Sequence, residues 1–188
     1  MIDLKQLGVL EGKAAWKVNV SCMVVNHDGN VVDAFLLGVV AALMDLELPR
    51  VRMDKVDGDE VVRLVDDRHG GVADGDNDNN NNNNNHNNNE GKEGKKLVFR
   101  KVCVPLTIGF FQGKMLVDPS LEEESLCDGM ITVVVDAMSV NQENGVLTGD
   151  ILNLSKSGGG VLSSMEEIAA CTQLALGRAK ELQPILLS

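Results

Sequence analysis

The stretch "DGNVVDAFLLGVVAALMDL", residues 28–46, decides the fold, because a short polar turn in it leads straight into an apolar helix. We expect Asp33 to be the helix N-cap, since its carboxylate can accept the backbone N–H groups of the next residues. The helix after it is apolar on every face, which predicts burial between a sheet and another layer. A turn before a helix can also hold an anion, but here a carboxylate stands at the anion's place.

Segments on both sides of this helix have the alternation of strands. Residues 17–25, "KVNVSCMVV", alternate apolar and polar side chains and predict a strand. Short strands are expected at 50–55 and 61–65, and longer β-rich segments at 96–111, 113–119, 130–137 and 151–160, with a loop at 141–150. A last helix begins at a capping box, Ser163 with Glu166 or Ser164 with Glu167, and is expected to end at Pro184. This order predicts an α+β fold.

The composition is that of a globular protein of 188 residues, 44% hydrophobic and 24% charged, enough for one domain with a core. We find no stretch of 18 apolar residues and no secretory signal. The net charge of −11 has the wrong sign for a protein that binds nucleic acid by itself, because neutralising the phosphates needs clustered Lys and Arg. Cys22, Cys103, Cys127 and Cys171 form no CxxC pair, so we expect buried thiols rather than a metal site or disulfides.

An asparagine tract fills most of residues 77–89. Such a composition cannot bury enough apolar surface to offset its ordering entropy, so we predict a disordered insert in a surface loop over residues 70–96. A basic cluster lies at its end and just beyond: Lys92, Lys95, Lys96, Arg100 and Lys101. This cluster is either a solvated face or a weak candidate for RNA contact.

The densest carboxylate cluster is "VDPSLEEESLCDG", residues 117–129, with Asp118, Glu122, Glu123, Glu124 and Asp128. Hard oxygen ligands in a rigid loop suit Mg²⁺, but a solvated acidic turn explains the same composition. The glycine-rich "SKSGGGV", residues 155–161, either offers backbone N–H groups to an anion or makes a tight turn. The histidines at 27, 69 and 86 have neither triad nor zinc spacing.

Taken in chain order, "DGNVVDAFLLGVVAAL", "VDPSLEEE" and "SKSGGG" before the helix at 166–182 resemble the RNase PH fold family. Within it, the chain is similar to the non-catalytic ring subunits of the eukaryotic RNA exosome. The resemblance implies an α+β fold of the ribosomal-protein-S5-domain-2-like type. It also implies a single domain over residues 1–188 that holds only the second half of the family domain. Apolar faces would then be open to a partner or prone to aggregation.

The resemblance further implies that a phosphate site is lost. In phosphorolytic members the turn reads Asp-Gly-Gly-Thr-Arg-Thr-Ala, and its arginine and hydroxyl groups hold the attacking phosphate. From the second glycine onward, this chain has instead Asn30, Val31, Val32 and Asp33. A guanidinium is thereby replaced by an isopropyl group, and a hydroxyl by a carboxylate that repels phosphate. The family's two metal-binding aspartates match Asp118 and Glu124, which we take as vestigial candidates.

Three functions stay open at this point. The first is a non-catalytic, structural subunit of the exosome ring, through which RNA is threaded to separate ribonucleases for RNA processing, including rRNA processing, and degradation. Its partners would be other RNase PH-like ring subunits and S1/KH cap subunits, with RNA contacted indirectly and with no membrane, cofactor or metal. The alternatives are an active phosphate-dependent 3′→5′ exoribonuclease and a metal-dependent hydrolytic nuclease that uses Asp118, Glu122, Glu124 and Asp128. The resemblance implies a location in the nucleus, including the nucleolus, and in the cytoplasm.

Overall fold

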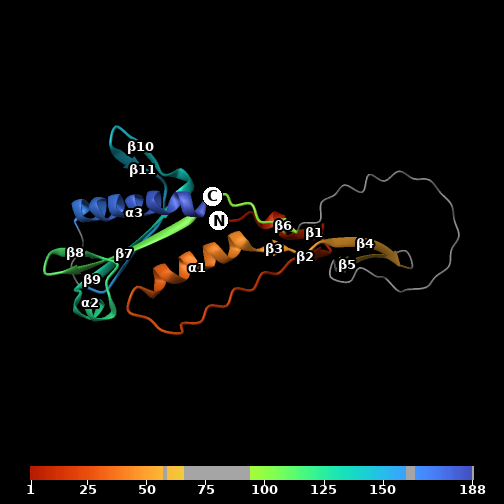
Figure 1. Cartoon of the computed structure of the whole chain (residues 1–188), viewed down its shortest axis with the longest axis horizontal. Helices are drawn as coiled ribbons and strands as arrows, with labels where there is room; N and C mark the ends of the chain where they lie inside the picture. Colours follow the sequence, from red (N-terminus) through yellow and green to blue (C-terminus); the bar gives the residue numbers. More distant parts are fainter. Residues whose placement is uncertain (57–58, 66–93, 160–163, 188) are drawn as a thin grey trace.

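A four-stranded antiparallel sheet carries the main core of the computed structural model, which describes residues 1–56, 59–65, 94–159 and 164–187. The strand order is β12-β9-β7-β8. These strands are β7 (Cys103–Phe111), β8 (Lys114–Val117), β9 (Gly129–Asp136) and β12 (Ile151–Ser157). Figure 1 shows α1 (Val31–Asp45) and α3 (Met165–Leu186) on either side of β7. The predicted α+β arrangement is therefore confirmed.

The core forms where the two central strands meet both helices. Strands β7 and β9 are nearly continuous runs of buried residues, because both faces of these strands are covered. The largest fully buried side chains include Ile108, Ile131 and Val133 of the sheet. Val40 of α1 and Cys171 of α3 belong to the same buried cluster. This packing fixes the position of the first turn of α1 against β7.

Smaller elements complete the fold: η1 (Leu4–Leu7), β1 (Gly8–Leu10), β2 (Ala14–Ala15), β3 (Glu47–Leu48), β4 (Val51–Val56), β5 (Asp59–Leu64), β6 (Lys95–Lys96), α2 (Leu121–Leu126), η2 (Ala137–Ser139), β10 (Asn141–Glu143) and β11 (Val146–Thr148). The β4–β5 hairpin confirms the short strands expected there. The loop expected at 141–150 is instead the β10–β11 hairpin. Its turn is Asn144-Gly145, whose φ angles of 50° and 81° are those that two-residue hairpins require.

Residues 70–93 of the predicted insert lie outside the described residues. Residues 94–96 are described, and Lys95 and Lys96 pair with Leu48 and Glu47 in the small β3–β6 ladder. For residues 70–93 the disordered insert therefore stays a prediction. Lys95 and Lys96, the last residues of the predicted insert, belong instead to strand β6. No helix in the described ranges is long and apolar enough to cross a membrane.

Both long helices differ from the expected boundaries. Helix α1 begins at Val31, so Asn30 is the N-cap residue and the prediction that Asp33 caps the helix is wrong. Helix α3 begins after Ser164, which forms the capping box with Glu167. The α3 helix also continues through Pro184 to Leu186. Pro184 has no N–H to donate to the carbonyl of Lys180, so one intrahelical hydrogen bond is missing in the last turn.

Two segments that the sequence predicts to be buried or paired expose apolar side chains to solvent instead. In α1, only Asp33 and Val40 are buried, and Val32 is 61% exposed, so the expectation of burial on every face is wrong. Residues 17–25 are extended but pair with no strand among the described residues, so the strand predicted there is absent. Met23 and Val25 in this segment are 83% and 88% exposed. These exposed apolar surfaces have the sequence of core elements, but no layer covers them among the residues that the structure describes.

Candidate functional site

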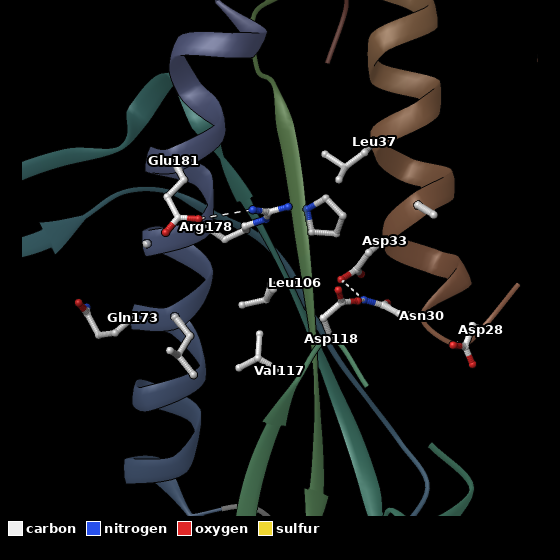
Figure 2. A pocket seen from close by; sticks show the side chains of 15 residues that line it. Asp28, Asn30, Asp33, Leu37, Leu106, Val117, Asp118, Gln173, Arg178 and Glu181 are labelled. Atoms are coloured by element: carbon white, nitrogen blue, oxygen red, sulfur yellow. Dashed lines mark hydrogen bonds and ion pairs between the residues drawn. The ribbon is translucent and has the colours of Figure 1, made fainter. Parts of the chain in front are cut away.

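A groove of about 780 Å³ runs between α1 and α3 along the free edge of β7. Its floor comes from β7 and β8, with Pro105, Leu106 and Val117. Pro105 lacks a backbone N–H group, which makes this part of the β7 edge a poor template for another strand. Figure 2 shows Asp33 and Asn30 on the α1 side, next to Asp118 at the end of β8. Of the residues that the sequence marked as a lost phosphate site, Asn30 and Asp33 line one end of this groove, whereas Val31 and Val32 do not line it.

Asp33 connects the first turn of α1 to the middle of β7. Its Oδ2 accepts the backbone N–H of Thr107 at 2.7 Å, and its Oδ1 accepts the Thr107 hydroxyl at 2.7 Å. The Asn30 amide donates a third hydrogen bond to Oδ2 at 2.9 Å. The side chain is only 7% exposed. A buried carboxylate is tolerated here because charge-assisted donors surround it.

The same contact marks the point where β8 leaves β7. The last residue pair in the β7–β8 ladder is Ile108 with Val117. Beyond it, the carbonyl of Thr107 accepts the N–H of Asp118 at 3.1 Å. Asp118 has a φ of 55°, so the backbone turns away there, and Asp33 takes the Thr107 N–H in place of a strand partner. Thr107 was not singled out from the sequence, although it is a lone hydroxyl within the apolar run 102–111.

Asn30 joins three carboxylates. Its Nδ2 donates to Asp33 and, at 2.5 Å, to Oδ1 of Asp118, while its backbone N–H donates to Oε1 of Glu124 at 2.8 Å. The residue is buried with a φ of 44°, a conformation that asparagine tolerates better than most residues. Its Oδ1 accepts no hydrogen bond among the described residues. An orphaned buried acceptor costs roughly 1–3 kcal/mol, so this arrangement is not optimised for stability alone.

The structure brings together only part of the predicted carboxylate cluster. Asp118 and Glu124 meet around Asn30, as described, whereas Glu122 is exposed on α2. Glu123 caps α2 in a capping box with Ser120. Asp128 accepts the backbone N–H of Gln112 at 3.3 Å, in a separate turn. Within the described ranges, no group of three His, Cys, Asp or Glu side chains is arranged to hold a metal ion.

Three of the four described side chains of the basic cluster pair with a carboxylate. Lys96 pairs with Glu47 at 3.7 Å, and Lys101 pairs with Asp150 at 3.2 Å. Arg100 pairs with Asp3, and Lys95 donates to the carbonyl of Gln6 at 3.3 Å. Lys92 lies outside the described residues. The four described side chains thus form separate local contacts rather than one open positive surface, which weakens them as RNA-binding candidates.

The cysteines are free thiols in the structure, and Cys22 is exposed. Burial raises the pKa of the Cys103 and Cys171 thiols above the ordinary value. Burial also raises the pKa of Cys127, helped by the nearby charges of Glu123 and Glu124. The glycine turn after β12 has positive φ at Gly158 and Gly159, and residues 160–161 of it lie outside the described residues.

Comparisons with known proteins agree with this fold. Residues 101–178 match the family described as "3′ exoribonuclease family, domain 2", and residues 3–49 match domain 1 of the same family. The match to domain 1 means that the expectation of a missing first half agrees only in part. A chain of a solved archaeal exosome core is 23% identical, with a TM-score of 0.62 over 100% of this chain and 57% of that one. A chain of the Archaeoglobus fulgidus exosome with RNA bound to the active site has a TM-score of 0.50 and 22% identity, over 85% of this chain and 44% of that one.

Relatives of known sequence are named exosome complex components, either Rrp42 or RRP45. The exosome complex component Rrp42 of Thermococcus onnurineus is 31% identical over 97% of this chain and 53% of its own length. That of Pyrococcus abyssi is 27% identical over 99% of this chain and 54% of its own length. The human exosome complex component RRP45 is 24% identical over 99% of this chain and 34% of its own length. The chain therefore spans about half the length of these archaeal relatives.

Proposed function

The chain belongs to the RNase PH-like 3′ exoribonuclease family, and from its site we propose that it is a non-catalytic, structural subunit of the exosome core ring. In that role it supports 3′→5′ RNA processing and degradation by associated ribonucleases. The observation that carries the proposal is the Asp33 carboxylate, fixed by Thr107 and Asn30 at the end of the groove.

A phosphate ion meets a repulsive site there. Two unit charges about 4 Å apart repel by roughly 1–4 kcal/mol, depending on the local dielectric constant. Val32, which matches the family's phosphate-binding arginine, is 61% exposed and has no charge to offer. The Asp33 side chain cannot swing away without leaving the Thr107 N–H unpaired inside the protein. The first turn of α1 thus presents a carboxylate acceptor, Asp33, where the family pattern has phosphate-holding donors, and the guanidinium that lines the groove, Arg178, is paired with Glu181 at 3.4 Å.

The carboxylates that match the family's metal ligands are engaged elsewhere. Asp118 accepts the Asn30 amide, and Glu124 accepts the Asn30 backbone N–H. Both groups therefore stabilise the turn before α1, which is a structural task. This supports the interpretation of Asp118 and Glu124 as vestiges of a catalytic pair.

The exposed apolar surfaces support the proposal that this chain is bound to partner proteins when it functions. The unpaired segment 17–25 and the exposed side of α1 each present large apolar side chains, such as Met23, Val25 and Val32. We propose other RNase PH-like ring subunits as direct partners, S1/KH cap subunits as further ones, and RNA contact through the assembled complex. The nucleus with its nucleolus and the cytoplasm are the proposed locations. The phrases "DGNVVDA", "LPRV" and "VDPSLEEES" support the exosome component 8 type within the ring, although the matched relatives are named Rrp42 and RRP45.

A test of the non-catalytic part is release of nucleoside diphosphates from RNA by the purified chain, with inorganic phosphate and Mg²⁺ present. We expect no release above the level of a phosphate-free reaction. Phosphate-dependent release that disappears in Asp118→Asn would contradict the proposal and support an active exoribonuclease. Release that persists in Asp118→Asn comes from a contaminating nuclease. Metal-stimulated RNA decay without phosphate, lost in the same variant, would support a hydrolytic nuclease instead.

A further inference from the structure

The outward side of α1 carries no charge until the last residue of the helix. Asp33 and Asp45 are the charged residues of α1, and Asp33 is buried against β7. The side chains of Val32 and Phe35 are 61% and 37% exposed. Small residues complete this outward side: Ala34, Gly38, Ala41 and Ala42. A helix with one side in water normally carries charged residues there, so α1 has the composition of a helix that is covered on both sides.

Segment 17–25, which leads through a turn into α1, is extended and unpaired. None of its backbone groups forms a hydrogen bond with another described residue. Val20 and Val24 are 54% and 44% exposed, whereas Met23 and Val25 are 83% and 88% exposed. Figure 1 shows the segment along the side of α1 that faces away from β7. An extended segment with unpaired backbone groups and apolar side chains is an edge to which another strand can add.

Both exposed features lie in the same part of the family match. Segment 17–25 and α1 fall within residues 3–49, which match domain 1, whereas the covered sheet falls within residues 101–178, which match domain 2. The Thermococcus onnurineus relative matches 97% of this chain with 53% of its own length. The archaeal exosome chain aligns with all of this chain over 57% of its own. Each of them therefore has a large part without a counterpart here, and the uncovered layer belongs to domain 1.

We infer that segment 17–25 and the outward side of α1 together bind a domain 1 polypeptide, namely the part of these relatives that this chain does not span. This polypeptide adds a strand beside segment 17–25 and lays the apolar face of its sheet on α1. The contact is apolar, because residues 18–25 hold no charged side chain. Buried apolar area and main-chain hydrogen bonds both stabilise such a contact. The binding is a property of this chain and does not depend on the ring role.

The test mixes the full chain with the part of the Thermococcus onnurineus relative that this chain does not match, produced as a separate polypeptide. The corresponding part of the Pyrococcus abyssi relative is a second probe, and the matched part of the first relative is the control polypeptide. Hydrogen–deuterium exchange with mass spectrometry follows the amides of the full chain. With either probe we expect exchange of segment 17–25 to slow at least tenfold, and exchange of the hairpin at 141–148 to stay within twofold. The control polypeptide is expected to leave both segments unchanged.

A lysine at Val32 tests the α1 side of this surface. Val32 is 61% exposed in the free chain, so Val32→Lys is tolerated there, but a covering layer would bury the added charge. We expect at least a tenfold weaker affinity for the probes, measured by isothermal calorimetry. Val146→Lys is the matched control, because Val146 is 56% exposed on β11, which packs on α3. It is expected to leave the affinity within twofold of the unsubstituted chain.

Two proline variants test the added strand. Successive N–H groups of a strand point to its opposite edges, so either Val20 or Ser21 donates to a strand added on one side. Val20→Pro and Ser21→Pro each remove one of these donors. Because segment 17–25 pairs with no described strand, both variants are expected to keep the urea midpoint of the free chain. At least one of them is expected to weaken probe binding tenfold or more.

Several results would overturn the inference. These are unchanged exchange of segment 17–25 with both probes, equal slowing by the control polypeptide, and full affinity in Val32→Lys and both proline variants. Dimerisation of the free chain that is lost in Val32→Lys would assign the surface to a second copy instead. If neither probe binds while the chain co-purifies with ring subunits, only this inference fails. If the probes bind while the chain purifies without ring subunits, the ring role fails instead.

Discussion

Asp33 and Thr107 are joined by two hydrogen bonds of 2.7 Å, one to the backbone N–H and one to the hydroxyl of Thr107. This pair ties the first turn of α1 to β7 at the residue where β8 departs. The Asp33 carboxylate is therefore a structural link between two layers of the protein.

Replacing Asp33 by alanine is expected to destabilise the protein. The change leaves the Thr107 N–H without an acceptor, whereas the Thr107 hydroxyl can still donate to Oγ1 of Thr132 at 2.9 Å, so the expected cost is about 1–3 kcal/mol. The measurement is urea denaturation monitored by circular dichroism. Asp45→Ala, at the exposed C-terminal end of α1, is the control and is expected to change the free energy of unfolding by less than about 0.5 kcal/mol. Equal effects of the two substitutions would contradict this role of Asp33.

Alanine substitutions at two glycines near the same helix are expected to have opposite effects. Gly29 has a φ of 87°, and a Cβ atom there would lie 2.5 Å from the carbonyl oxygen of Pro119, so Gly29→Ala is expected to destabilise. Gly38 lies within α1 with open space around its Cα, so Gly38→Ala is expected to stabilise by about 0.5–1 kcal/mol. Thermal melts of both variants give the comparison. A stabilised Gly29→Ala would show that the turn does not pack against the start of α2.

The thiols are expected to differ strongly in reactivity. Cys22 is exposed and should react with iodoacetamide first, whereas Cys103 and Cys171 are buried with raised pKa values and should react only after unfolding. The measurement is mass spectrometry of tryptic peptides over a time course at pH 8. Rapid labelling of Cys171 in the folded chain would contradict the packing of α3 on the sheet.

The same pKa shifts predict a loss of stability in alkaline solution. The folded thiols of Cys103 and Cys171 hold their protons to higher pH than the unfolded thiols, whose ordinary pKa is 9.0. Above that pH the unfolded chain binds fewer protons than the folded chain, so the free energy of unfolding falls as pH rises. Denaturation at pH 8 and pH 10 measures it. Substituting both cysteines by alanine is expected to reduce this pH dependence, and an unchanged dependence would contradict the assignment to these thiols.

Segment 17–25 is expected to exchange its amide hydrogens rapidly in the isolated chain. It pairs with no strand among the described residues, whereas residues 103–110 of β7 are paired with β9 and should exchange slowly. Hydrogen–deuterium exchange with mass spectrometry compares the two segments. When partners are bound, protection of 17–25 should rise. Slow exchange of 17–25 in the isolated chain would show that it is already covered.

Much of the fold could be predicted from local sequence signals. Runs of β-forming, mostly apolar residues located β4, β5, β7, β8, β9 and β12, and the capping-box pattern located the start of α3. The strand expected at 17–25 failed for a tertiary reason, since a strand needs a neighbour and the described chain supplies none. The hairpin at 141–148 was missed, although Asn144-Gly145 is a strong turn signal, because each of its strands has only three residues and the first is entirely polar.

The family pattern pointed to residues of the candidate site, but the sequence did not show which hydrogen bonds these residues make. Val32 and Asp33 pointed to a lost phosphate site through the family pattern. That Asp33 bonds Thr107, 74 positions away in sequence, depends on how α1 lies on β7, which no local pattern encodes. The role of Asn30 as the amide between Asp33 and Asp118 was hidden for the same reason.

The central claim is that this chain builds a ring with related subunits, and affinity purification of the tagged full chain from its own cells tests it most directly. Mass spectrometry identifies and quantifies the proteins that co-elute. If the chain is a ring subunit, we expect near-stoichiometric recovery of other RNase PH-like subunits together with S1-domain subunits. Recovery of the chain alone, or with chaperones only, would contradict it.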